Sequence, residues 1–175
     1  MTETVRSLIA IVVIIQGIGA VRTFTPVRGR KRGWGSVSLV AFAIVLAGAN
    51  FSGLYEPALI PGIAGLIAAV ALFGWARMTI RGKFFSYINS TDVPQFVCTA
   101  GPYHWIRHPF YASYLLTLMA AAVLFPNYAT IIGAIVAIAA FNYAAKFEES
   151  KFEGSPLAGE YRAYMQRTGR FLPRM

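Results

Sequence analysis

The sequence predicts an all-α integral membrane protein with five transmembrane helices, accompanied by a cytoplasmic loop and a C-terminal helix. Three observations predict this class. Of the 175 residues, 57% are hydrophobic and only 13% are charged, whereas a soluble domain usually carries about 25% charged residues. The hydrophobic residues fall in five long segments, and the basic residues gather at the ends of alternate segments. The length suits a single domain, 1–175, with three helices in 1–80 and a helical hairpin and C-terminal segment in 81–175.

The five segments have lengths near that of a membrane span, which takes about 20 apolar residues to cross a core of ~30 Å. Four of them meet or approach this length, namely residues 34–54, 58–78, 109–125 and 127–147. The fifth, residues 8–21, is short and contains Gln16, so it spans only if it extends to Val5 and Phe24 and Arg6 turns its charge to the water. A cleaved signal peptide is not expected, because the preceding basic region is weak, no small-x-small site follows and arginines come directly afterwards.

The basic residues predict the orientation of the chain. Of the sixteen lysines and arginines, only Arg6 lies near the start of the first segment. The others follow the first span, flank the connection between the third and fourth, or follow the fifth: Arg22, Arg28, Arg30, Lys31, Arg32, Arg77, Arg81, Lys83, Arg107, Lys146, Lys151, Arg162, Arg167, Arg170 and Arg174. The positive-inside rule therefore places the N-terminus outside and the C-terminus in the cytoplasm. The net charge of +9 then reflects membrane topology, and no nucleic-acid partner is expected.

Proline, glycine and capping residues predict the connections. Pro126-Asn127 joins the last two spans in a tight helical hairpin, and Pro109 lies in the first turn of its helix, where proline is tolerated. Ser155-Pro156 is typical of an N-cap and first helical residue, which predicts a cytoplasmic helix that ends at Gly169. One face of this helix carries Leu157, Tyr161, Tyr164, Met165 and Thr168. That face either docks onto the membrane or the protein body, or it lines a site.

Residues able to do chemistry cluster at the cytoplasmic ends of the fourth and fifth spans. They are Tyr103, His104, Arg107, His108, Tyr111, Ser113, Lys146, Glu148 and Glu149. A tight hairpin would bring the two groups together at one membrane depth, as a functional site or as ordinary interfacial anchoring. No metal site is expected, since His, Cys and Asp never recur at ligand spacing, and Cys98, the single cysteine, is predicted to be a small buried or interfacial apolar residue. No Walker, Rossmann or GxSxG pattern occurs either.

Two separated motifs resemble those of the isoprenylcysteine carboxyl methyltransferase family. The first is GPYHWIRHPFYAS at 101–113, which matches the GPY and RHP-x-Y pattern that opens a membrane helix in the family. The second comprises Glu148-Glu149, Glu160-Tyr161, Tyr164 and the TGRFLP of residues 168–173. The resemblance extends over residues 96–173. It departs from the family where Pro156-Leu157-Ala158-Gly159 replaces an expected Phe-Gly, and the stretch between Glu148 and Tyr161 is one residue longer.

The resemblance implies S-adenosylmethionine as the cofactor, bound on the cytoplasmic side in a pocket made by the loop before the fourth span and the C-terminal segment. Carried over by position, His108, Tyr111 and Glu148 would hold the cofactor with Tyr103 and Tyr161, while Pro109 shapes the helix entry. Glu149 would contact the cofactor or organise the reacting centre. Arg107 and Arg170 would meet an anionic group of the cofactor or the substrate.

The acceptor implied is a lipid-like molecule that enters sideways from the bilayer. A carboxylate acceptor needs a cationic partner, whereas an amine acceptor needs a base, and the residue types offer both. We expect a carboxylate acceptor, like an isoprenylcysteine, because the cytoplasmic ends of the spans are rich in arginine, which favours anions. The alternatives are a phospholipid amine methyltransferase, a sterol-reductase-like NADPH enzyme and a non-enzymatic membrane scaffold. The sequence leaves the oligomeric state open.

Overall fold

A computed structural model describes residues 1–23, 34–81, 94 and 96–174. These residues form helices and no strand, apart from one isolated bridge between Ile106 and Gly169. The six α-helices are α1 (Thr2–Thr23), α2 (Trp34–Asn50), α3 (Leu59–Thr79), α4 (Pro109–Leu124), α5 (Tyr128–Glu153) and α6 (Ala158–Arg167). Two short 3-10 turns, η1 (Glu56–Ala58) and η2 (Gly101–His104), precede α3 and α4.

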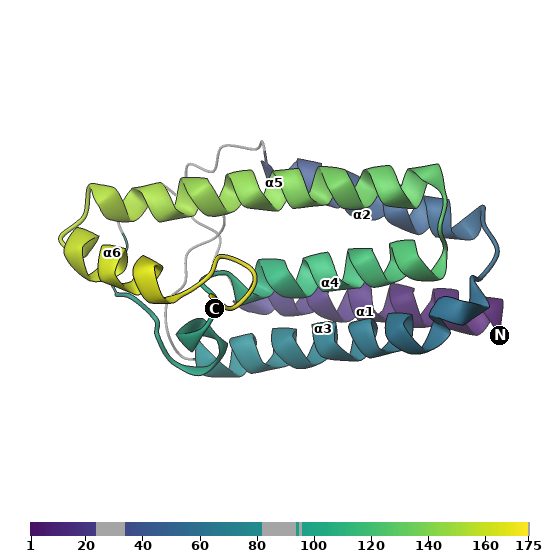
Figure 1. The fold of residues 1–175 in the computed structure, drawn as a ribbon, viewed down its shortest axis with the longest axis horizontal. Helices are drawn as coiled ribbons and strands as arrows, with labels where there is room; N and C mark the ends of the chain where they lie inside the picture. The colour runs from purple at the N-terminus through teal and green to yellow at the C-terminus, as the bar shows by residue number, and fades with distance from the viewer. Residues whose placement is uncertain (24–33, 82–93, 95, 175) are drawn as a thin grey trace.

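Five long helices lie alongside one another at the places that the hydrophobic segments predict (Figure 1). By length and composition, three stretches are able to cross a membrane: Thr2–Ala20, Glu56–Thr79 and Tyr128–Glu153. The apolar part of α2 from Leu39 and the 16 residues of α4 are shorter. At 1.5 Å per residue α4 is about 24 Å long, less than the ~30 Å of a bilayer core. The all-helical architecture is thus confirmed for the described residues, and the count of five spans stays a prediction.

The helices pack chiefly as α3 against α4, α2 against α5 and α4 against α5. Aromatic side chains from three of these helices meet in the interior: the rings of Phe73 and Phe110 lie 5.2 Å apart and those of Tyr114 and Phe141 lie 5.7 Å apart. Large apolar side chains also cover the outside of the bundle, among them Ile14, Ile60, Ile67, Tyr128 and Ile135. An apolar exterior of this extent suits lipid rather than water.

The predicted hairpin between α4 and α5 is present, at the end of the bundle where the N-terminus also lies (Figure 1). Asn127 caps α5, since its side chain accepts from the N–H of Ala129 (2.9 Å) and of Thr130 (3.1 Å) in a capping box. At the same end Arg6 donates to the carbonyls of Ala49 (2.9 Å) and Ser52 (2.8 Å). Its charge therefore complements the C-terminal end of α2 instead of simply turning to water.

The prediction for the last helix is wrong at both ends. α6 begins at Ala158 instead of Pro156, because the Ser155 hydroxyl accepts from the N–H of Leu157 (3.2 Å) within a turn that precedes the helix. It ends at Arg167 instead of Gly169, and Thr168 is already extended. The predicted apolar face docks onto the protein body: Tyr161 and Tyr164 are buried, and the Tyr164 hydroxyl donates to the carbonyl of Tyr103 (2.6 Å).

Candidate active site

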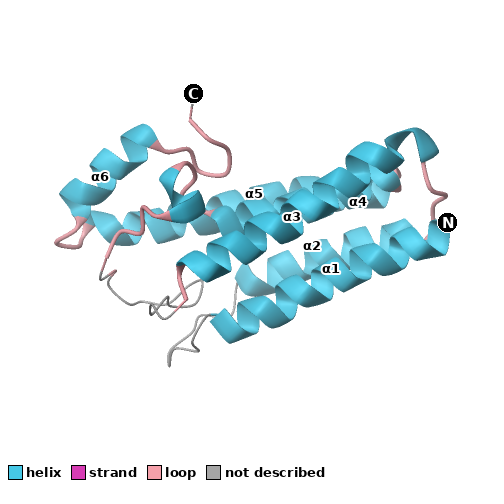
Figure 2. Cartoon of the chain, turned by 90° about the horizontal axis from the view of Figure 1, so that it is seen from below, coloured by secondary structure: helices cyan, strands magenta, loops and turns pink. Residues whose placement is uncertain are grey.

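The candidate site lies at the end of the bundle opposite the hairpin, where α4 begins and α5 ends. Figures 1 and 2 both show α6 at this end and the N-terminus at the other. The C-terminal segment after α6 returns to the start of α4, so that three separate parts of the chain meet there (Figure 1).

Backbone hydrogen bonds join the C-terminal segment to the residues before α4 in a short parallel pairing. The N–H groups of Arg107 and His108 donate to the carbonyls of Gly169 (2.9 Å) and Arg170 (3.1 Å), and the N–H of Gly169 donates to the carbonyl of Trp105 (3.0 Å). A side chain at Gly169 would collide with the backbone carbonyl of Leu172, so the pairing requires glycine there. The two motifs of the sequence are therefore held in one fixed register.

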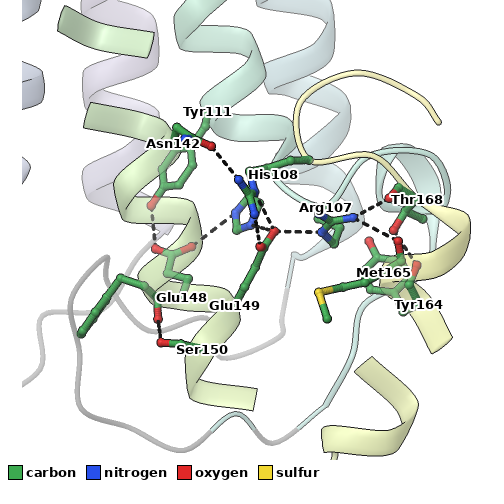
Figure 3. Close-up of polar contacts among 12 residues, drawn as sticks. Arg107, His108, Tyr111, Asn142, Glu148, Glu149, Ser150, Tyr164, Met165 and Thr168 are labelled. Carbon is green, nitrogen blue, oxygen red and sulfur yellow. Dashed lines mark hydrogen bonds and ion pairs between the residues drawn. The ribbon is translucent and has the colours of Figure 1, made fainter. Parts of the chain in front are cut away.

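Glu149 is the centre of the cluster of ionisable side chains (Figure 3). Its Oε1 accepts from Nε of Arg107 (2.8 Å) and from Nε of Arg170 (3.1 Å), and its Oε2 accepts from Nη2 of Arg170 (2.6 Å). Nε2 of His108 lies 3.3 Å from Oε1. The carboxylate is only 8% exposed, and a charge so enclosed is stable only when it is paired and hydrogen-bonded in this way.

His108 lies between the two glutamates. Its Nδ1 is 3.4 Å from Oε2 of Glu148, and its Nε2 faces Glu149. Burial lowers the pKa of this histidine, but the hydrogen bonds to Glu148 and Glu149 outweigh burial and the pKa is raised. Both ring nitrogens face carboxylates, an arrangement that favours the protonated form of the ring. Glu148 also accepts from the Tyr111 hydroxyl (2.6 Å) and remains 27% exposed (Figure 3).

The two arginines have different surroundings. Arg107 also donates to the carbonyls of Thr168 and Met165, which ties Glu149 to the end of α6 (Figure 3). Its side chain is 10% exposed. Arg170 is 27% exposed, and its Nη1 donates to Oδ1 of Asn142 (2.6 Å), a residue of α5 that the sequence analysis did not select. The sequence offered one signal for Asn142, namely its position: it is the first strongly polar residue after the apolar residues 131–141.

The structure thus brings together six of the predicted site residues: Arg107, His108, Tyr111, Glu148, Glu149 and Arg170. The buried Pro109 begins α4 directly beside them. Tyr103 and Tyr161 instead lie in the packing of α6, where Tyr161 stacks on Phe152 with ring centres 3.8 Å apart. Burial raises the pKa of both phenols, which therefore stay protonated.

Three residues of the predicted cluster lie away from its centre. His104 and Lys146 are exposed. Ser113 is fully buried inside the bundle and donates to the carbonyl of Phe110 (2.7 Å). Cys98 is buried, as predicted. Within the part of the chain that the structure describes, no group of His, Cys, Asp and Glu could hold a metal ion.

A family model described as the isoprenylcysteine carboxyl methyltransferase (ICMT) family matches residues 62–153, more than half of the 175 residues. The matched part contains Arg107, His108, Tyr111 and both glutamates of the cluster. A comparison with curated proteins finds no match.

Proposed function

This chain belongs to the isoprenylcysteine carboxyl methyltransferase family, and on that premise we propose that it methylates a lipophilic acceptor in the membrane with S-adenosylmethionine as the methyl donor. The family and the apolar helices identify an integral membrane protein with a methyltransferase fold. The observation that supports the proposal most is the cluster around Glu149, because it joins both sequence motifs at the end of two adjacent helices.

The side chains of the cluster suit the chemical groups of S-adenosylmethionine. Glu148 is the partly exposed carboxylate and suits an ammonium group or ribose hydroxyls. Beside it the ring of Tyr111 lies 5.1 Å from that of Phe141 and 6.5 Å from that of Phe171. Aromatic faces attract cations, which suits a sulfonium. His108, Tyr111 and Glu148 would therefore hold the cofactor, while Glu149 holds the arginines.

A carboxylate acceptor suits this cluster better than an amine. When bound, S-adenosylmethionine supplies a methyl group that a carboxylate oxygen takes without any proton transfer. A carboxylate is already ionised near neutral pH and needs a cationic partner, which the partly exposed Arg170 provides. An amine acceptor would need a base, but Glu149 is engaged by two arginines, and His108 is engaged by Glu148 and Glu149.

The chain's contribution to the rate is then mainly orientation. Transfer of a methyl group to an oxygen requires the reacting atoms in line, and holding them so supplies much of the catalysis. The parallel pairing of Arg107 and His108 with the C-terminal segment fixes the depth of Arg170 relative to the start of α4. The acceptor's apolar tail stays in the bilayer, and its head group reaches Arg170 at the cytoplasmic side.

Calorimetry with S-adenosylmethionine and with NADPH tests the proposal on the purified protein. We expect binding of S-adenosylmethionine alone, since the cluster has the donors and acceptors for it. A second step measures methyl transfer to a panel of prenyl-cysteine, fatty-acid and phosphatidylethanolamine acceptors. Binding of NADPH alone would favour a reductase, and binding of neither ligand would favour a scaffold. Methylation of phosphatidylethanolamine alone would favour an amine acceptor.

A further inference from the structure

Asn142 is an amide in a helix whose preceding residues, 131–141, carry no polar side chain. A polar residue at such a position in a membrane helix is expensive to bury and usually has a function. It lies seven residues before Glu149, which is two helical turns or about 10 Å along α5 towards the hairpin. Asn142 therefore lies on the side of the site that faces the membrane interior.

Asn142 and Glu149 hold the Arg170 guanidinium from two sides. Nη1 donates to Oδ1 of Asn142 and Nη2 to Oε2 of Glu149, each over 2.6 Å, while Nε donates to Oε1 of Glu149. A guanidinium has five N–H groups. Three of them are used in this way, which leaves one on each terminal nitrogen for another acceptor.

The surroundings of this pair contain more donors than acceptors. The Asn142 oxygen is used by Arg170, and no described residue accepts a hydrogen bond from the Asn142 NH₂ group. The nearby charged groups are the arginines Arg107 and Arg170 and the carboxylates Glu148 and Glu149, and each carboxylate already has a partner in Arg107, Arg170, His108 or Tyr111. The spare N–H donors of Asn142 and Arg170 favour an oxyanion and oppose an ammonium group, which has no acceptor to offer them.

We infer that Asn142 is a positioning residue that turns Arg170 towards the acceptor's head group, and that the Asn142–Arg170 pair selects an anionic head over a cationic one. This inference rests on the proposed function, because it assigns the acceptor end of the same site. It also identifies Arg170, rather than Arg107, as the arginine that meets the acceptor, since Arg107 is tied to Glu149 and to two carbonyls of α6 and its end.

The test compares Asn142→Asp with the wild type. Aspartate keeps an oxygen for Arg170, so the guanidinium remains held, but it removes both amide donors and adds a negative charge. The matched control is Asn50→Asp, which places the same change on an exposed residue at the far end of α2. Two ligands that share an 18-carbon tail are titrated in detergent with S-adenosylmethionine present: oleate and oleyl-trimethylammonium, at about pH 8, where a carboxyl is ionised.

We expect the Asn142→Asp protein to bind oleate about 10- to 100-fold more weakly, the loss of a hydrogen bond to a charged group, and to bind the ammonium ligand more tightly. Affinity for S-adenosylmethionine should change by less than about threefold, and Asn50→Asp should leave all three affinities unchanged. If Asn142 has a purely structural role, the substitution will weaken the binding of both lipids alike and leave the ratio of their affinities unchanged. That result would overturn this inference and leave the proposed function standing. A wild type that does not bind S-adenosylmethionine overturns the proposed function, and the inference with it.

Discussion

Replacing Glu149 with glutamine would remove the negative charge that three cationic side chains share. The carboxylate accepts three hydrogen bonds from Arg107 and Arg170 and lies 3.3 Å from His108. Glutamine keeps the size of the side chain but offers one oxygen in place of two, and its NH₂ group faces other donors. Both Glu149 (8% exposed) and Arg107 (10% exposed) are enclosed by protein, so water cannot replace the lost contacts.

The expected cost follows from this burial. Removing one partner of a buried ion pair destabilises a protein by about 3–5 kcal/mol. Glu148→Gln is the matched control on the neighbouring residue, which is 27% exposed and can still accept from Tyr111 through its amide oxygen. A change at that position should cost about 1 kcal/mol, the net value of an ordinary hydrogen bond.

Thermal unfolding in detergent measures the stability of the two variants, and limited proteolysis shows which segment of each is cleaved first. Glu149→Gln should unfold at a clearly lower temperature than Glu148→Gln, and the segment after α6 should be cleaved first, because Arg170 loses its main anchor. Equal stabilities of the two variants, with an equally protected C-terminal segment, would show that the cluster around Glu149 does not hold the site together.

Three further predictions concern the cofactor, pH and topology. His108→Ala should weaken binding of S-adenosylmethionine about 10- to 100-fold, whereas His104→Ala, a change at an exposed side chain, should have little effect; calorimetry that finds equal small effects would place the cofactor elsewhere. The pKa of His108 is raised, so its stabilising effect is complete below the unfolded value of about 6.5 and is lost as pH rises through the folded pKa. Melting temperatures should therefore fall with rising pH in the wild type more steeply than in His108→Gln, and identical slopes would contradict this. Cysteines introduced at Gly29, which lies outside the described residues, and at Gly154 should react with an impermeant label only from the cytoplasmic side, in a protein whose Cys98 is replaced; labelling from opposite sides would exclude five spans.

The hydrophobic segments predict where the helices lie because apolar length is a local property that the sequence displays directly. All five long helices are found where it places them. The hydrophobic segments cannot establish the number of membrane spans, however. The helix α4 has only 16 residues, and a short helix can lie inside a bundle without crossing the membrane. The hairpin was predictable for a similar reason: Pro126 and Asn127 are adjacent in the sequence, and the Asn127 side chain caps α5 locally.

The site was only partly predictable, because its parts are brought together by contacts between distant segments. The motif resemblance identified the residues of both segments, but no local pattern shows that Trp105 to His108 would pair with Gly169 and Arg170. The same pairing ends α6 early, since Thr168 leaves the helix to extend towards it. Asn142 was missed because its role depends on Arg170, which comes much later in the chain.

The pairing of the C-terminal segment with the start of α4 sets an order for biosynthesis. Ribosomes add the chain at about 5–20 residues per second, so Arg170 follows Glu149 by roughly 1–4 seconds, after all five long helices have been made. Of the partners of Glu149 among the described residues, Arg107 and His108 have been made by then and Arg170 has not. Synthesis of the five long helices therefore comes before assembly of the cluster around Glu149, which is complete only when the segment after α6 has folded back to the start of α4.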